Sequence, residues 1–303
     1  MKVFFSINGV KELAENIKGT ENIYLGIRPY GFHAGNMMSL VVYPLLLCKY
    51  LLDNNIEPKF NIYIFINDWE QDRLDGPDIL KFPFNIYPLN STLQFTFEPS
   101  NPRQSIVDYW EPIILKNVNI IRSKYPNVRI NLVRNSNMKY HPIMKKHLIN
   151  TLKNPELVAN VFKNTTKKDV LTYPLKYAMA VCPNCFLARG DTFVAGNKVI
   201  HFCTVCNLTF NGVYEDFEYW FYHKCLAIPR LEIFDIDICI TGYDHYEEGD
   251  FYTRRSLIKA FNSKAKIPLT LYAPKVYGNN GQVMGKSKGN IKIIELDNLI
   301  NIA

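Results

Sequence analysis

The sequence predicts an α/β fold in which a parallel sheet is interrupted by a four-cysteine metal module. Three observations predict it. A strand, helix and strand pattern covers residues 22–66, two further strand-like runs lie within residues 236–272, and two Cys-x-x-Cys pairs lie between them. Strands that alternate with helical patterns are typical of parallel sheets.

The first half of the sheet is predicted by three consecutive segments. Asn22–Ile27 and Phe60–Ile66 are apolar and β-branched, as buried strands are, and Met37–Leu52 carries a helical apolar face that Pro44 should kink. Two parallel strands joined by a helix form a right-handed βαβ unit. Ligands in such sheets bind at the carboxyl ends of the strands, so we expect a site after residue 27 and after residue 66.

The remaining elements follow from the same patterns. Residues 106–125, 142–162, 214–227 and 256–261 look helical, residues 236–241, 267–272 and 291–295 look like strands, and residues 76–104 look irregular. The order predicts a half-sheet with a helical insertion (1–170), a metal-binding insertion with an aromatic segment (171–229) and a second half-sheet (230–303).

The composition excludes a disordered chain, and the net charge indicates which partners are favoured. Of 303 residues, 48% are hydrophobic and 21% are charged, as in a globular protein. The net charge of +7 favours a polyanion such as ATP or tRNA, although no dense Lys/Arg block marks a nucleic-acid surface and a basic enzyme without nucleic acid fits equally well. No signal peptide is recognisable. Met37–Leu52 is broken by Ser39, Pro44 and Lys49, so we expect it to be too short to span a bilayer. We therefore expect a cytoplasmic protein with no membrane partner.

Four of the seven cysteines have the spacing of a metal site. Cys182 and Cys185 form one knuckle, and Cys203 and Cys206 form the other. Four thiolates select zinc and leave no open position, so we expect a structural Zn²⁺, with four unrelated free thiols as the alternative. His201 is a neighbour that could replace one ligand. The other three thiols, Cys48, Cys225 and Cys239, lie in apolar contexts and are expected to be buried.

The turn after the first strand has the residues of a phosphate site. Gly26 ends the strand, Gly31 and Gly35 let the backbone approach a ligand, and His33 and Asn36 can donate hydrogen bonds at the start of a helix. An ordinary loop histidine is the alternative.

A second candidate lies near the C-terminus. Lys286 and Lys288 occupy a glycine-rich loop with Met284 and Ser287, and a mobile lysine can stabilise a pyrophosphate in the transition state. A solvated basic loop is the alternative. Together with the His33 turn, this loop suits the two ends of ATP.

Further candidates follow the predicted strands. Gly242 leaves room for a nucleotide and Asp244 can accept hydrogen bonds from ribose hydroxyls, unless the segment is an ordinary turn. Asp68 could meet an ammonium group or cap a helix. Trp220 could form a pocket wall or belong to an aromatic core stripe.

These motifs together carry a family resemblance. His33-Ala-Gly-Asn36 resembles the HIGH signature of class I aminoacyl-tRNA synthetases, in the HIGN form of the class I lysyl-tRNA synthetases. Met284-Gly-Lys-Ser-Lys-Gly-Asn290 resembles their KMSKS loop, Phe65-Ile-Asn-Asp-Trp69 resembles their acidic-aromatic turn, and Gly242-Tyr-Asp-His245 resembles their Gly-Lys-Asp-His. The cysteine knuckles and the segment with Trp220 lie in the expected order, so the resemblance covers residues 20–295.

The resemblance implies a Rossmann-type catalytic domain that forms an aminoacyl-adenylate from ATP, Mg²⁺ and lysine or a lysine-like amino acid. It assigns His33 and Asn36 to the phosphates, Lys286 to the transition state, and Gly242 and Asp244 to the ribose. His245, with Trp220 and Asp68, is a candidate for the amino-acid pocket. No anticodon-binding region follows residue 303, so we expect a truncated paralogue that passes the amino acid to tRNA, to a carrier protein or to a small-molecule amine or hydroxyl.

Two other functions stay open at this point. Val283 and Gly285 replace the first lysine and the serine of the KMSKS signature, and Tyr243 replaces the lysine of Gly-Lys-Asp-His. These changes motivate a degenerate regulatory protein that binds a nucleotide, an amino acid or RNA without chemistry. A zinc-dependent nucleic-acid-binding module is the third hypothesis, disfavoured by the lack of a basic stripe.

Overall fold

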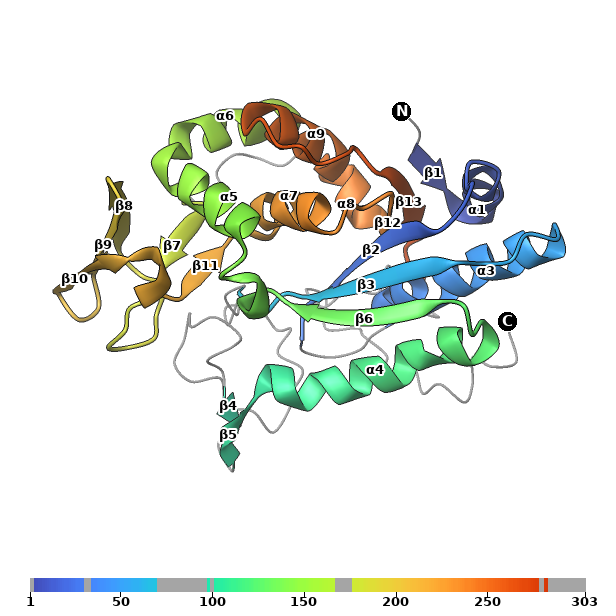
Figure 1. Cartoon of the computed structure of the whole chain (residues 1–303), viewed down its shortest axis with the longest axis horizontal. Helices are drawn as coiled ribbons and strands as arrows, with labels where there is room; N and C mark the ends of the chain where they lie inside the picture. Colours follow the sequence, from blue (N-terminus) through green and yellow to red (C-terminus); the bar gives the residue numbers. More distant parts are fainter. Residues whose placement is uncertain are drawn as a thin grey trace.

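A six-stranded parallel sheet forms the centre of the protein, with strand order β1-β13-β12-β2-β3-β6 (Figure 1). The structure is a computed structural model that describes residues 3–29, 34–69, 97–98, 101–166, 176–277 and 281–282, with the backbone alone for 97–98 and 101–104. The strands are β1 (Val3–Phe5), β2 (Glu21–Ile27), β3 (Phe60–Ile66), β6 (Arg129–Arg134), β12 (Ile238–Gly242) and β13 (Leu269–Ala273). The predicted α/β class with a parallel sheet is confirmed.

The strand order is that of a doubly wound, Rossmann-type sheet. From β2 the chain proceeds outward through β3 to β6, then returns to the other side of β2 and proceeds through β12 to β13. The N-terminal strand β1 adds a further edge beside β13. Sequence patterns missed both edge strands. β6 begins and ends with arginine and has no fully buried side chain, and β1 has only three residues.

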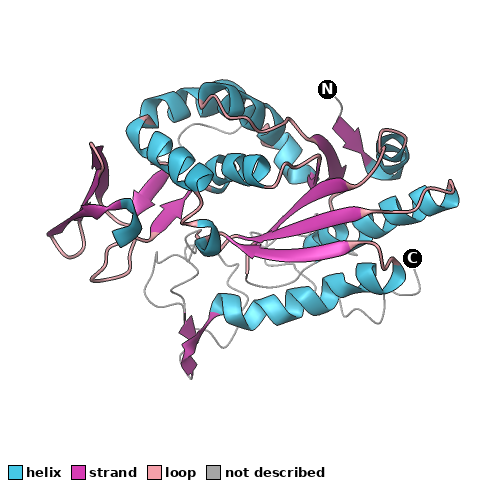
Figure 2. Cartoon of the chain, in the orientation of Figure 1, coloured by secondary structure: helices cyan, strands magenta, loops and turns pink. Residues whose placement is uncertain are grey.

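Two hydrophobic clusters cover the two faces of the sheet, and β3 shows the division. Phe60, Ile62 and Ile64 point into one cluster, whereas Phe65 points into the other. The first cluster includes α1 (Ser6–Ala14), α3 (Tyr43–Asp53) and α4 (Ile106–Lys124). The second includes α5 (Pro142–Lys153), α6 (Pro155–Thr165), α7 (His223–Ile233) and α9 (Asp250–Ala260). Figure 2 shows the two helical layers on opposite sides of the strands.

The helix predicted at residues 37–52 is longer in the structure, where it runs from Ala34 to Asp53. It comprises α2 (Ala34–Met37), a π-helical turn (Met38–Val42) and α3. The π-helical turn ends two residues before Pro44, the position where a kink was expected. Over its 20 residues, Ala34–Asp53 is long and apolar enough to cross a membrane by length and composition. The expectation that this segment is too short was therefore wrong. Its apolar side chains instead form the core with β2 and β3, as those of a buried helix do.

Two predicted helices need correction. Residues 142–162 form two helices because Pro155 disfavours helical geometry at Asn154, which has φ −128° and ψ 53°. Residues 214–227 form a 3₁₀ turn (Tyr214–Asp216), the strand β11 (Tyr219–Phe221) and only then the start of α7. The three aromatic residues of β11 are buried on both faces, a pattern that suits a short buried strand and not an amphipathic helix.

In sequence, the cysteine module lies between the two halves of the sheet. Its strands are β7 (Ala178–Ala180), β8 (Asp191–Ala195), β9 (Lys198–Cys203) and β10 (Leu208–Val213), and β7 pairs with β11. The three strands β8, β9 and β10 form a separate antiparallel sheet at the left end of the molecule in Figure 1, beyond the carboxyl ends of β3 and β6. The remaining elements are β4 (Phe97–Glu98), β5 (Asn101–Ser105), a 3₁₀ turn (Ser136–Met138) and α8 (Tyr243–Glu247). The predicted strand at residues 291–295 lies outside the described residues.

Candidate functional site

The point where the strand order reverses lies between β2 and β12. β2 pairs with β3 along all seven of its residues, Glu21–Ile27, but with β12 only at Ile23 and Tyr24. The carboxyl ends of β2 and β12 therefore diverge. In open α/β sheets, ligands bind outside the carboxyl ends of the two strands at such a point.

The β2 side of this point carries the predicted phosphate turn. Gly26 lies one residue before the end of β2 and is exposed. Gly35 and Asn36 lie in the first turn of the helix that begins at Ala34, so their backbone is at a helix N-terminus. Gly31 and His33 lie outside the described residues.

The β12 side carries the predicted ribose site. Gly242 is the last residue of β12 and the N-cap residue of α8. Asp244 follows in the first turn of α8 and is exposed, so its carboxylate is accessible at this edge of the sheet. A Cβ atom on Gly242 would meet the Asp244 carboxylate, so any larger residue here would displace that exposed side chain. His245 is half-buried and lies near the buried Asp250. Burial alone would raise the pKa of the Asp250 carboxyl, but the charge of its ion-pair partner Arg254 and, to a lesser extent, His245 lower it.

Asp68, a candidate for the amino-acid pocket, is buried and hydrogen-bonded to the protein itself. It follows β3, it is 1% exposed, and its Oδ1 accepts hydrogen bonds from the backbone N–H of Asn135 (2.9 Å) and of Ser136 (3.2 Å). The Ser136 hydroxyl donates to its other oxygen. Burial raises the pKa of Asp68 to about 6, although these hydrogen bonds oppose the rise. The carboxylate thus caps the 3₁₀ turn at Ser136–Met138, which is the second of the two roles considered.

Trp220 lies in the middle of β11, opposite Met179 of β7. It is 9% exposed and belongs to the second hydrophobic cluster, where its ring centroid is 6.4 Å from that of Tyr222. This environment corresponds to the aromatic core stripe considered as the alternative to a pocket wall.

A residue that sequence reasoning missed lies at the same edge of the sheet. Arg230 of α7 is fully buried; its Nη1 donates to Tyr24 Oη (2.7 Å), and its Nε and Nη2 both donate to Asn135 Oδ1 (3.0 and 2.6 Å). Nη2 also donates to Asn67 Oδ1, and the guanidinium carbon lies 5.2 Å from the Phe65 ring centroid. None of these hydrogen-bond acceptors is a carboxylate.

This arginine joins the two halves of the fold. Tyr24, Asn67 and Asn135 belong to β2 and to the segments that follow β3 and β6, whereas Arg230 precedes β12. One guanidinium therefore links β2 and the segments after β3 and β6, all in the first half, to the second half. The signal in the sequence is a single arginine within the apolar run Cys225–Ile233.

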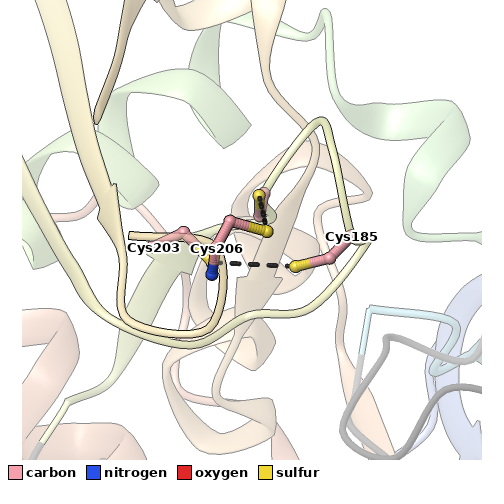
Figure 3. Close-up of side chains that lie close together, drawn as sticks. Cys185, Cys203 and Cys206 are labelled. Carbon is pink, nitrogen blue, oxygen red and sulfur yellow. Dashed lines mark hydrogen bonds between the residues drawn. The ribbon is translucent and has the colours of Figure 1, made fainter. Parts of the chain in front are cut away.

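The four cysteines form a metal-binding arrangement (Figure 3). Their Sγ atoms all lie within 4.8 Å of one another, with 3.6 Å between Cys185 and Cys203 and 3.9 Å between Cys182 and Cys206. Tetrahedral zinc with Zn–S bonds of about 2.3 Å requires sulfur atoms about 3.8 Å apart. The donor set and its spacing therefore fit zinc, and four protein ligands leave no position for a substrate.

His201 lies beside this centre but is not part of it. Its Nδ1 is 3.0 Å from the Thr192 hydroxyl, and its side chain lies on the buried side of β9. The described residues that come together as metal ligands are the four cysteines alone. Cys48, Cys225 and Cys239 are buried free thiols, as predicted.

The lysine loop follows β13, which pairs with β12 and ends at the same edge of the sheet. Met284, Lys286 and Ser287 lie outside the described residues. The site therefore consists, within the described part of the chain, of Gly26, Gly35 and Asn36 on one side and of Gly242 and Asp244 on the other.

No protein-family model matches this chain, and no curated protein sequence matches it significantly. Solved structures do match. One is a tyrosyl-tRNA synthetase from Archaeoglobus fulgidus in complex with L-tyrosine, with 12% sequence identity and a TM-score of 0.40, covering 94% of this chain and 65% of that chain. Another is an arginyl-tRNA synthetase from Plasmodium falciparum, with 14% identity and a TM-score of 0.37, covering 98% of this chain and 47% of that chain.

This chain spans less than two thirds of the length of either of these synthetases. Because both TM-scores lie below 0.5, the assignment of the fold rests on the parallel strand order and not on the two structures.

Proposed function

We propose that this protein activates an amino acid with ATP, in the manner of a class I aminoacyl-tRNA synthetase. The observation that supports this most is the placement of two glycine-containing motifs, which are far apart in sequence, on adjacent strand ends at the reversal of the strand order. One motif includes Gly35 and Asn36 at a helix N-terminus, and the other includes Gly242 and Asp244. Such an edge accommodates a nucleotide with its phosphates at the helix and its ribose at the carboxylate.

The proposed reaction joins the amino-acid carboxylate to the α-phosphorus of ATP and releases pyrophosphate. His33 and Asn36 donate hydrogen bonds to the phosphates, Asp244 accepts from the ribose hydroxyls, and Lys286 stabilises the charge that develops as pyrophosphate leaves. Mg²⁺ accompanies ATP. A zinc ion held by Cys182, Cys185, Cys203 and Cys206 would support the module and would take no part in the chemistry, because four protein ligands would complete its coordination.

The proposed substrate is lysine or a lysine-like amino acid, because the motifs resemble those of class I lysyl-tRNA synthetases. Of the three proposed pocket residues, His245 lies directly beyond β12, whereas Asp68 and Trp220 are buried. The proposed acceptor is the 3′ end of a tRNA, with a carrier protein or a small amine or hydroxyl as alternatives. A cytoplasmic location is part of the same proposal.

Amino-acid-dependent exchange of labelled pyrophosphate into ATP tests this function. The screen covers all standard amino acids and lysine analogues, with and without total tRNA. Exchange should appear with lysine or an analogue and should fall by at least about a hundredfold in Lys286→Ala, since one transition-state donor contributes about that much. Lys288→Ala, a change of the same kind two residues away, is the matched control and should retain most of the activity.

A second function competes because of Asp68. The carboxylate proposed to meet the substrate ammonium is buried and accepts three hydrogen bonds from the protein itself. A protein that binds ATP and no amino acid would need no such carboxylate. Calorimetric binding of ATP together with absent exchange for every amino acid would favour this second function and contradict the first.

A further inference from the structure

An exposed glycine lies where β2 and β12 diverge. The side chains of β2 that point into the first hydrophobic cluster are Ile23, Leu25 and Ile27. Because side chains alternate along a strand, Tyr24 and Gly26 face the opposite side of the sheet, where α7 packs. Gly26 is exposed, and the three atoms nearest to the position of a Cβ there all belong to Tyr24, with Oη at 3.4 Å. A ligand that rests on Gly26 therefore meets the Tyr24 hydroxyl.

A guanidinium fixes this hydroxyl from the other side. Arg230 Nη1 donates to Tyr24 Oη over 2.7 Å, so the phenolic hydrogen stays available for another acceptor. No residue in the described part of the chain accepts a hydrogen bond from this hydroxyl. Burial raises the pKa of Tyr24, so the hydroxyl keeps its proton. It is therefore a donor beside Gly26.

Arg230 brings a positive charge to this donor. The arginine is fully buried, and its acceptors are the neutral oxygens of Tyr24, Asn67 and Asn135. Among the described residues, no carboxylate forms an ion pair with it, and the buried Asn135 Nδ2 has no acceptor. A buried cation and a donor that lacks an acceptor both favour a ligand that offers an acceptor.

The carboxylates that follow β3 and β12 do not offset this preference. Asp68 accepts hydrogen bonds from two backbone N–H groups, Glu247 pairs with Lys275, Glu248 with Lys224 and Asp250 with Arg254, and Asp244 is exposed at the proposed ribose position. The charges of Arg230 and Arg254 both oppose the rise in the pKa of Tyr24, as a positive potential does. An ammonium at this position would therefore be repelled.

The place of the hydroxyl decides which part of an amino acid meets it. The proposed phosphate and ribose positions lie beyond the ends of β2 and β12, at Gly35 and Gly242. The carboxylate that attacks ATP must lie there as well, and the α-ammonium is attached to the adjacent carbon. Gly26 lies one residue inside this edge. The group that reaches Tyr24 is therefore the end of the side chain.

We propose that Tyr24, held by Arg230, selects a lysine-like amino acid whose side chain ends in an uncharged hydrogen-bond acceptor, such as a hydroxyl or an amide carbonyl. This selection rests on the proposed function and narrows its substrate to one without a side-chain ammonium. An ammonium over Gly26 lies within about 6 Å of Nη1, because Tyr24 Oη is 3.4 Å from that position and 2.7 Å from Nη1. At an effective dielectric constant of about 20, this repulsion weakens binding about a hundredfold.

Calorimetric titration of the full chain with three amino acids, without ATP, tests the selection. Lysine carries the ammonium, 6-hydroxynorleucine has a hydroxyl in its place, and norleucine lacks the terminal group. We expect 6-hydroxynorleucine to bind about a hundredfold more tightly than lysine and up to about tenfold more tightly than norleucine, the effect of one hydrogen bond. Lysine or norleucine binding as tightly as 6-hydroxynorleucine, or no detectable binding of any of the three, would overturn the inference.

Three variants test the two residues. Tyr24→Phe removes the donor, so it should weaken the binding of 6-hydroxynorleucine up to about tenfold and leave that of norleucine unchanged. Tyr63→Phe is the matched control, because Tyr63 lies opposite Tyr24 on β3 and packs against Phe234. Equal effects of the two changes would overturn the inference.

Arg230→Met removes the repulsion and should reduce the preference for 6-hydroxynorleucine over lysine about a hundredfold. This variant is less stable, but a loss of folded protein lowers both apparent affinities equally and leaves their ratio unchanged. An unchanged ratio would contradict the role of the guanidinium.

Pyrophosphate exchange separates this inference from the proposed function. Selective binding of 6-hydroxynorleucine without exchange for any amino acid would leave the selection intact and contradict the proposed function. Exchange that prefers lysine over 6-hydroxynorleucine would support the proposed function and overturn the selection.

Discussion

The buried carboxyl of Asp68 makes the stability of the fold depend on pH in an unusual direction. An acid whose pKa is higher in the folded protein than in the unfolded chain binds its proton more tightly when folded. Its contribution to stability is therefore complete below the unfolded pKa and is lost as the pH rises through the folded pKa. For Asp68 the window runs from the ordinary value of 3.8 to about 6.

The magnitude follows from this shift. A difference of about two pKa units corresponds to about 3 kcal/mol, since one unit is about 1.36 kcal/mol, and about 2 kcal/mol of it should be lost between pH 4.5 and pH 7. Asp68→Asn removes the titration and keeps the shape, and its amide oxygen still accepts from the Asn135 N–H. We expect the free energy of unfolding of the unchanged protein, minus that of Asp68→Asn, to fall by about 2 kcal/mol across this range.

Urea denaturation of both proteins at closely spaced pH values measures this difference, and titrating groups that the two share cancel. Asp53→Asn, an exposed aspartate that pairs with Lys49 on α3, is the surface control and should not reproduce the fall in stability with rising pH. A difference that rises with pH would refute the reasoning, because it would mean that the hydrogen bonds from Asn135 and Ser136 outweigh burial and lower the pKa. A flat difference for Asp68→Asn would mean that the two effects cancel.

Three further predictions concern the metal centre, the buried arginine and a glycine. Purified protein should hold about one zinc per chain by mass spectrometry, and Cys203→Ser should hold far less; a folded protein without zinc would contradict the site. Arg230→Met should lower the free energy of unfolding by about 2–5 kcal/mol because the buried Asn135 and the half-buried Tyr24 and Asn67 lose their donor, whereas the exposed Arg129→Met should change it little; equal effects would refute this role of Arg230. Gly190 has φ +118°, and a Cβ there would collide with the Phe202 carbonyl. Gly190→Ala should therefore cost about 3 kcal/mol or more, against about 1–2 kcal/mol for Gly196→Ala in open space; thermal denaturation distinguishes them.

Sequence patterns were sufficient where one local property decides the structure. The apolar, β-branched run Phe60–Ile66 is buried on both sides of the sheet and was predicted with its bounds, and the cysteine spacing predicted which four thiols converge. Patterns failed where packing decides. Tyr219–Phe221 is aromatic enough for either a helix or a strand, and pairing with β7 makes it a strand.

The sequence by itself determined the α/β class, the inserted position of the module and the identity of the metal ligands, because hydrophobic periodicity and ligand spacing are local properties of the chain. Tertiary structure alone decided that Asp68 caps a turn, that Trp220 is in the core, and that Arg230 joins β2 to the segments that follow β3 and β6. These depend on contacts between residues as far as 206 positions apart, which no local pattern encodes.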